Sequence, residues 1–111
     1  MTFEEATQKA LEFRHERDWE QFHNPKDLAI SLNLEAAELL ETFQWSGCDL
    51  RAEANKAHMS EELADVLIYC IYFAEELNID IPEAICAKLE LNAKKYPVDK
   101  AKGVSAKYTE L

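Results

Sequence analysis

The sequence predicts an all-α protein, a four-helix bundle in a single domain. The chain has only two glycines and three prolines in 111 residues, too few for the closely spaced turns of a β-sandwich or barrel. Pro25 and Pro82 fall where helices are expected to begin, and Pro97 falls where one is expected to end. A helix tolerates proline in its first turn but not in its interior. Hydrophobic residues make up 48% of the chain, which is enough for a packed core.

The first two helices have clear starts. Thr2 and Glu5 have the spacing of a capping box, and the helix that follows is expected to extend to about residue 22. Asn24 then caps a second helix that has Pro25 in its first position and extends to about residue 45. We expect these two helices to follow one another with only a short break.

The last two helices are marked by an apolar run and by prolines. The third is expected to begin between residues 50 and 60 and to end at about Leu77. Its apolar run, residues 66–74, is far shorter than the roughly 20 residues of a membrane-spanning helix. Pro82 begins a fourth helix that Pro97 ends. We therefore expect a domain over residues 1–97 and a polar C-terminal tail over residues 98–111.

The charge balance limits the partners. There are 22 acidic against 12 basic residues, a net charge of −10. Such a surface repels phosphate backbones and anionic lipid, so we expect neither nucleic-acid nor membrane binding. The N-terminus has no basic stretch followed by an apolar one, and the three cysteines lack a Cys-x-x-Cys spacing. These features predict a reduced, cytoplasmic protein.

The second helix carries apolar residues on two faces. At the helical repeat, one face collects Leu28, Leu32, Leu39 and Phe43, and the opposite side collects Ile30, Leu34 and Ala37. A short chain has few internal partners for a second apolar face. We therefore expect a homo-oligomer.

Two pairs of carboxylates lie among these apolar residues. Glu35 and Glu38 are three residues apart on the second helix, and Glu62 and Asp65 on the third. Like charges at this spacing repel, and no lysine or arginine lies one turn away to neutralise them. Four carboxylates from two facing helices suit a hard divalent ion, Mg²⁺ first and Mn²⁺ second. The alternative is that these acids line a solvated edge.

A second metal reading is less consistent with the predicted helices. Glu12-x-x-His15 and Glu20-x-x-His23 match the Glu-x-x-His spacing of di-iron bundles, which take that motif from two different helices. Here both copies lie on one predicted helix, about 12 Å apart at 1.5 Å per residue. They cannot face each other across one core without a second subunit.

The carboxylate pattern resembles a known signature. Glu35-x-x-Glu38, followed after 23 residues by Glu62-x-x-Asp65, is similar to the motif of the all-α nucleoside triphosphate pyrophosphohydrolases, the MazG-like superfamily. The surrounding segments resemble its dCTP pyrophosphatase branch; they are residues 17–23, 43–45, 61–69, 92–97 and 107–111. The resemblance covers nearly the whole chain.

The resemblance implies a fold and an activity. It implies Mg²⁺-dependent hydrolysis of a nucleoside triphosphate, dCTP or a related dNTP, to the monophosphate and pyrophosphate, in a homodimer or homotetramer. The four metal ligands would be Glu35, Glu38, Glu62 and Asp65. Relatives often have glycine before each of the first two glutamates, where this chain has Leu34 and Ala37. That departure bears on the width of the pocket and on base preference.

Given a nucleotide substrate, further residues become candidates. Lys88, Asn92 and Lys95 recur on one helical face and are expected to contact phosphates, with solvated surface lysines as the alternative. For the base and neighbouring contacts, the candidates are Trp19, His23, Trp45, Tyr69 and Tyr96. The alternative for these aromatics is the hydrophobic core.

The expected mechanism is attack by water on a phosphorus of the triphosphate chain, assisted by Mg²⁺. Glu38, at the less apolar edge of the stripe, is the expected general base. Another functional class remains open at this point: a non-catalytic helical module that binds a protein through its second apolar face.

Overall fold

The computed structural model describes all 111 residues as helices, turns and loops without a strand. The all-α class is confirmed. The helices are α1 (Phe3–Glu16), α2 (Pro25–Glu41), α3 (Lys56–Glu76), α4 (Ile81–Lys95) and the single turn α5 (Val98–Ala101), with 3₁₀ turns at Trp19–Phe22, Glu53–Asn55 and Tyr108–Glu110. None of these helices is both long enough and apolar enough to cross a membrane.

The predicted capping box begins α1, which ends earlier than expected. The Thr2 hydroxyl accepts a hydrogen bond from the Glu5 amide at 3.1 Å, and the Glu5 carboxylate accepts one from the Thr2 amide at 2.9 Å. The helix stops at Glu16 because Asp18 takes a left-handed conformation with φ of 52°, which an α-helix cannot accommodate. A 3₁₀ turn beginning at Trp19 follows, so this indole lies outside α1.

The α2 helix begins as predicted and ends four residues before Trp45. The Asn24 side chain accepts a hydrogen bond from the Asp27 amide at 2.9 Å, with Pro25 in the first helical position. At the other end, the hydroxyl and the amide of Thr42 both donate to the Leu39 carbonyl, at 2.7 and 3.2 Å. This tightens the last turn and releases the chain into the loop that carries Trp45.

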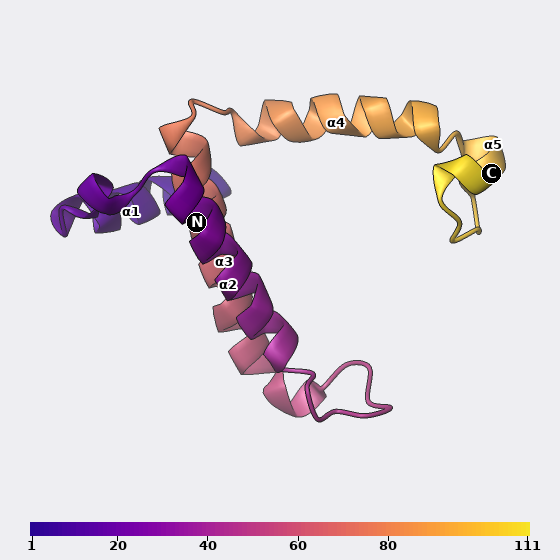
Figure 1. Cartoon of the computed structure of the whole chain (residues 1–111), viewed down its shortest axis with the longest axis horizontal. Coiled ribbons are helices and arrows are strands. Elements are labelled where there is room, and N and C mark those ends of the chain that lie inside the picture. The colour runs from indigo at the N-terminus through magenta and orange to yellow at the C-terminus, as the bar shows by residue number, and fades with distance from the viewer. The chain divides into compact units, whose positions relative to one another are not determined.

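The chain forms two compact units, Met1–Asn78 and Ile79–Leu111. In the first unit, α2 and α3 lie side by side over their lengths, and α1 packs against α3 (Figure 1). This pairing positions the candidate site, because the carboxylates predicted to act together come from α2 and α3.

The core of the first unit is small. Leu28 is 1% exposed, and Ile71, Tyr72 and Ala74 of α3 are also buried. On the opposite side of α2, Ile30 and Leu34 remain 49% and 59% exposed. The two-faced pattern of α2 thus corresponds to one buried and one exposed apolar face.

The second unit contains α4 and the C-terminal segment. Asp80 caps α4, and Pro82 lies in its first turn; the helix ends before Pro97, as predicted. No residue of α4 is buried. The segment after Pro97 is partly helical, and the Tyr108 ring packs edge-on against Tyr96, with centroids 5.9 Å apart.

Candidate functional site

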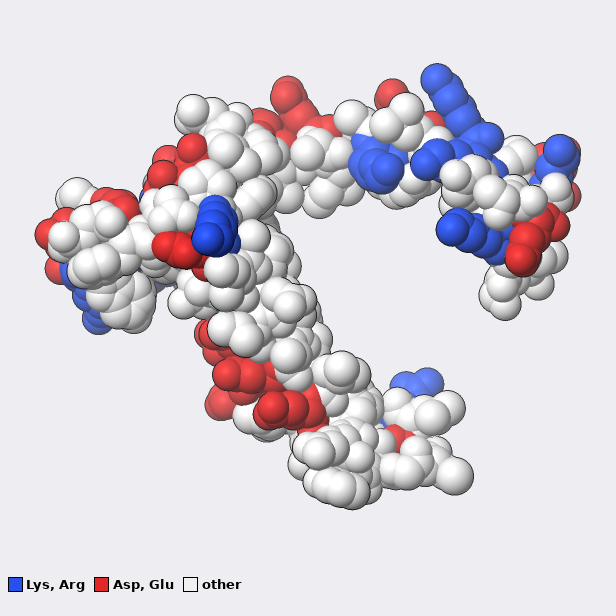
Figure 2. Space-filling view, in the orientation of Figure 1, with Lys and Arg blue, Asp and Glu red and all other residues white.

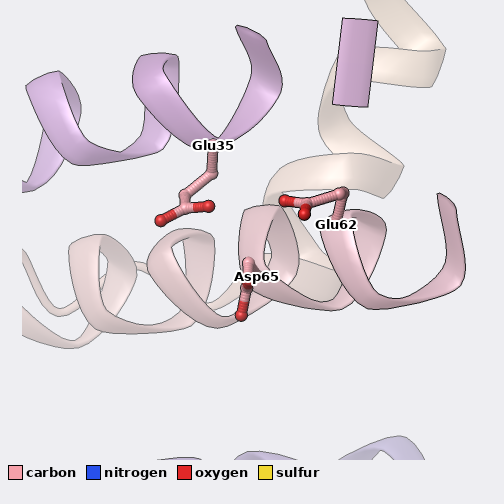
Figure 3. A group of neighbouring side chains, drawn as sticks. All are labelled: Glu35, Glu62 and Asp65. Atoms are coloured by element: carbon pink, nitrogen blue, oxygen red, sulfur yellow. The ribbon is translucent and has the colours of Figure 1, made fainter. Parts of the chain in front are cut away.

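Three of the four predicted metal ligands gather between α2 and α3. Glu35, Glu62 and Asp65 each offer a carboxylate oxygen, and these oxygens lie within 4.8 Å of one another. Figure 3 shows Glu35 extending from α2 toward α3, which carries Glu62 and Asp65 one turn apart. In Figure 2, acidic side chains form a patch over the α2–α3 pair. No other group of three or more His, Cys, Asp or Glu side chains in the chain brings its ligand atoms close enough together to hold a metal ion.

Glu38 lies at the exposed edge of this cluster. Its side chain is exposed, and it is close enough to interact with both Glu35 and Glu62. We use the name carboxylate cluster for Glu35, Glu38, Glu62 and Asp65. The exposed side chain of Glu38 is therefore in contact with water.

The carboxylate cluster holds more negative charge than its surroundings stabilise. Burial, then hydrogen bonding to Glu38 and repulsion from the other acids, raises the pKa of Glu35 to about 7. Hydrogen bonding to Glu38, followed by burial, raises the pKa of Glu62. One oxygen of each, Oε2, is buried without a hydrogen-bond partner. A cation between the helices would satisfy these orphaned oxygens, so the residues present fit a divalent metal ion.

His58 lies beside the cluster and was not singled out from the sequence. Its Nε2 is 3.5 Å from Glu62 Oε1, and its Nδ1 is 4.0 Å from Glu61 Oε2. The signal in the sequence is the spacing, because a histidine four residues before a glutamate lies on the same face of a helix.

A cavity of about 620 Å³, which we call the aromatic cavity, adjoins the carboxylate cluster. Glu35 and Asp65 form part of its wall, together with the aromatic rings of Trp19 and Tyr69. Phe13 holds the Trp19 ring edge-on, with centroids 5.7 Å apart. A flat ring entering this cavity would meet aromatic faces near the carboxylates.

Trp45 lines a different cavity. Its side chain is 90% exposed, and it borders a space of about 420 Å³ together with His58, Asn55 and Asp49. Asp49 Oδ1 accepts a hydrogen bond from the buried Ala52 amide at 3.1 Å, which shapes this loop. One chain therefore does not bring Trp19 and Trp45 into the same cavity.

His23 packs behind the wall of the aromatic cavity. Its ring stacks on Tyr72 at a centroid distance of 5.4 Å, and its Nδ1 is buried without a hydrogen bond. Burial, and then the Arg14 cation, lower the pKa of His23. His23 is not among the residues that line the cavity with Trp19 and Tyr69.

The di-iron arrangement does not form within the chain. His15 Nδ1 lies 2.7 Å from Glu20 Oε2. The histidine of the first Glu-x-x-His motif thus pairs with the glutamate of the second. His23 instead stacks on Tyr72. These residues do not form a metal-binding group within one chain.

The remaining predicted contacts belong to the second unit. Lys88 borders an apolar patch with Ile81, Ile85 and Leu89, and Asn92 is half-buried. The Lys95 ammonium lies 5.0 Å from the centroid of the Tyr108 ring. Contacts of these residues and of Tyr96 with phosphate stay predictions.

Comparison with known proteins is consistent with the carboxylate pattern. A family model described as the MazG-like family matches residues 30–111. The chain is 41% identical to dCTP pyrophosphatase 1 of Homo sapiens and 40% identical to that of Mus musculus, in each case over 99% of this chain and 68% of the relative. A crystal structure of a pyrophosphatase from Archaeoglobus fulgidus superposes with a TM-score of 0.79 at 43% identity, covering 85% of this chain and 91% of the other. The resemblance noted in the sequence is confirmed, and the chain belongs to the MazG-like family.

Proposed function

We propose that this protein is a Mg²⁺-dependent pyrophosphohydrolase that converts dCTP, or a closely related dNTP, to the monophosphate and pyrophosphate. Family membership and about 40% identity to dCTP pyrophosphatases over nearly the whole chain make it a nucleoside triphosphate pyrophosphohydrolase. The observation that carries the finer proposal is the carboxylate cluster, two members of which, Glu35 and Asp65, lie in the wall of the aromatic cavity.

The carboxylate cluster is the proposed magnesium site. Glu35, Glu62 and Asp65 would hold the ion, with Glu38 beside them, and Mn²⁺ would substitute because it accepts the same oxygen ligands. The bound ion would supply charge neutralisation to the triphosphate. The raised pKa of Glu35 supports this assignment, because burial, and then the neighbouring carboxylates, disfavour the ionised form of Glu35 in the absence of a cation.

The aromatic cavity is the proposed site of the nucleobase. Its volume of about 620 Å³ lies within the usual range of small-molecule pockets, roughly 300–1,000 Å³. Trp19 and Tyr69 offer ring faces, and stacking contributes about 1–3 kcal/mol per base. Because stacking tolerates every base, the preference for cytosine would come from hydrogen bonds to the ring edge.

Glu38 is the proposed general base. Its exposed carboxylate lies at the edge of the cluster, where it can take a proton from an attacking water. The water oxygen bonds to the α-phosphorus while the bond between that phosphorus and the α,β-bridging oxygen breaks. Pyrophosphate leaves with the bridging oxygen, and the monophosphate keeps the oxygen from water.

The working form is proposed to be a homo-oligomer, a dimer or a tetramer. Ile30 and Leu34 are exposed on α2, and α4 has no buried residue, although isolated helices of this length are marginal in water. A second copy would cover these faces and could bring Trp45 to the aromatic cavity of its neighbour. Light scattering should give a multiple of the chain mass of 12.8 kDa; a monomer at micromolar concentration would overturn this part.

A substrate panel tests the proposal. The purified protein is incubated with the eight common NTPs and dNTPs and with 5-modified dCTP, with Mg²⁺, Mn²⁺ or excess EDTA, and the products are separated by chromatography. We expect dCTP or a related dNTP to be consumed fastest, and only with metal. Equal turnover of purine and pyrimidine dNTPs would refute the proposed base preference, and turnover in EDTA would refute the metal requirement.

A further inference from the structure

His58 is a nitrogen-bearing side chain that lies close to the carboxylate of Glu62. It precedes Glu62 by one turn of α3, and its Nε2 approaches Glu62 Oε1 to 3.5 Å. The neighbouring carboxylate of Glu61 is 4.0 Å from the other ring nitrogen, and its side chain is 79% exposed. The imidazole therefore faces a shielded carboxylate on one side and a solvated one on the other.

The two oxygens of Glu62 have different surroundings. The Glu62 side chain is 12% exposed, with Oε1 toward His58. Oε2 is buried without a hydrogen-bond partner, in the carboxylate cluster. A carboxylate held at one oxygen cannot rotate freely, so it keeps its other oxygen available for a cation.

We propose that His58 is a positioning residue for the metal site, which would orient Glu62 by donating a hydrogen bond from Nε2–H to Oε1 across this contact. This inference rests on the proposed function, because it assumes that Glu62 binds the metal ion. Hydrogen-bonded partners of metal ligands typically change metal affinity by about 10–100-fold when they are removed. The distance of 3.5 Å is long for a hydrogen bond, and such contacts often tighten when a site is filled.

The competing role is direct contact with the nucleotide. His58 lines the cavity of about 420 Å³ that also contains Trp45, and its side chain is 57% exposed. A substrate in that cavity would reach the imidazole without involving Glu62. The two roles differ in one measurable respect, because only the positioning role affects metal binding when no nucleotide is present.

The test compares three substitutions of His58. The dissociation constant for Mn²⁺ is measured at one pH without nucleotide, by titration calorimetry, for His58→Ala, His58→Gln and His58→Asn. The amide nitrogen of glutamine can occupy the place of Nε2, whereas that of asparagine lies near the place of Nδ1. We expect alanine and asparagine to weaken metal binding by about 10–100-fold and glutamine to restore most of the affinity.

Glu61→Gln is the matched control, because it removes the exposed carboxylate next to His58 on the same helix. We expect its affinity for Mn²⁺ to stay within about twofold of the wild type, and thermal melting in EDTA checks that every variant folds. If His58→Ala leaves the Mn²⁺ affinity unchanged, the inference is overturned. This holds even if the same variant has a higher KM for nucleotide, because that result would indicate direct contact with the nucleotide instead. If the wild-type protein binds no divalent ion, both the inference and the proposed metal site are overturned. Unchanged affinity in His58→Ala overturns only the role of His58 and leaves the proposed metal site intact.

Discussion

Arg14 Nη1 lies 2.8 Å from Glu76 Oε1, and the arginine side chain in this ion pair is only 6% exposed. The guanidinium carbon is also 5.0 Å from the ring centroid of Tyr72, whose hydroxyl donates to the Ala10 carbonyl at 2.9 Å. These contacts join α1 to α3. They hold together the two helices that contribute most of the wall of the aromatic cavity.

Glu76→Gln is therefore expected to destabilise the protein. The substitution leaves Arg14 buried with its charge unpaired, and losing a hydrogen bond between charged groups costs about 1.5–3 kcal/mol. Urea denaturation at one fixed protein concentration measures the free energy of unfolding. Glu75→Gln, at an exposed neighbouring position, serves as the control and should change it by less than about 0.5 kcal/mol. Equal stability of the two variants would show that the ion pair contributes nothing.

Neutralising any member of the carboxylate cluster is expected to abolish most turnover without unfolding the protein. The variants are Glu35→Gln, Glu38→Gln, Glu62→Gln and Asp65→Asn. Without metal the carboxylates repel one another, so each variant should melt in EDTA at or above the wild-type temperature. Steady-state kinetics with saturating Mg²⁺ measures the loss. A variant that keeps a near-wild-type rate would remove its residue from the proposed site.

The metal-free protein is expected to lose stability as the pH rises. The pKa of Glu35 is raised from its ordinary value of 4.5 to about 7 in the folded state. The folded state therefore binds more protons than the unfolded state between these values. The stabilisation from protonated Glu35 is complete below about pH 4.5 and is lost as the pH passes through about 7.

Thermal melting in EDTA across pH 5 to 8, about the window that the Glu35 pKa defines, checks this expectation. Glu35→Gln should have a flatter profile than the wild type, because an amide does not titrate. Saturating Mg²⁺ should also reduce the decline, because the ion binds the ionised form. Wild-type and Glu35→Gln profiles that coincide in EDTA would contradict the assignment.

Substitution of the indoles tests the base site. Trp19→Ala is expected to weaken binding of every accepted nucleotide by a similar factor, equivalent to about 1–3 kcal/mol. Trp45→Ala should do the same if a neighbouring subunit completes the cavity. His23→Ala should keep the ranking among bases, because His23 stacks on Tyr72 outside the cavity lining. Inhibition by non-hydrolysable analogues measures both the binding strength and the ranking among bases. A changed ranking in His23→Ala would assign base recognition to His23.

Much of the fold could be predicted because its signals are local. A capping box, an asparagine cap and prolines mark where helices begin or end, and these depend on neighbouring residues only. The early end of α1 could not be predicted, because a left-handed Asp18 is an uncommon conformation that composition does not specify.

The carboxylate cluster was predictable for a related reason. Charges spaced at helical intervals within an apolar stripe indicate which face they share, so Glu35, Glu62 and Asp65 could be placed together from spacing. Whether Trp19 and Trp45 share a cavity depends on the path of the 3₁₀ turn and of the loop after α2. The Arg14–Glu76 pair joins residues 62 positions apart, and no periodic pattern specifies such a contact.

The position of the bond that is cleaved tests the central claim most directly. The protein is incubated with dCTP and Mg²⁺ in water enriched in ¹⁸O, and the products are identified by ³¹P NMR and mass spectrometry, with Glu38→Gln as the inactive control. The proposed function predicts equal amounts of dCMP and pyrophosphate, with the label in dCMP. Formation of dCDP and labelled orthophosphate, or no turnover of any nucleoside triphosphate, would contradict it.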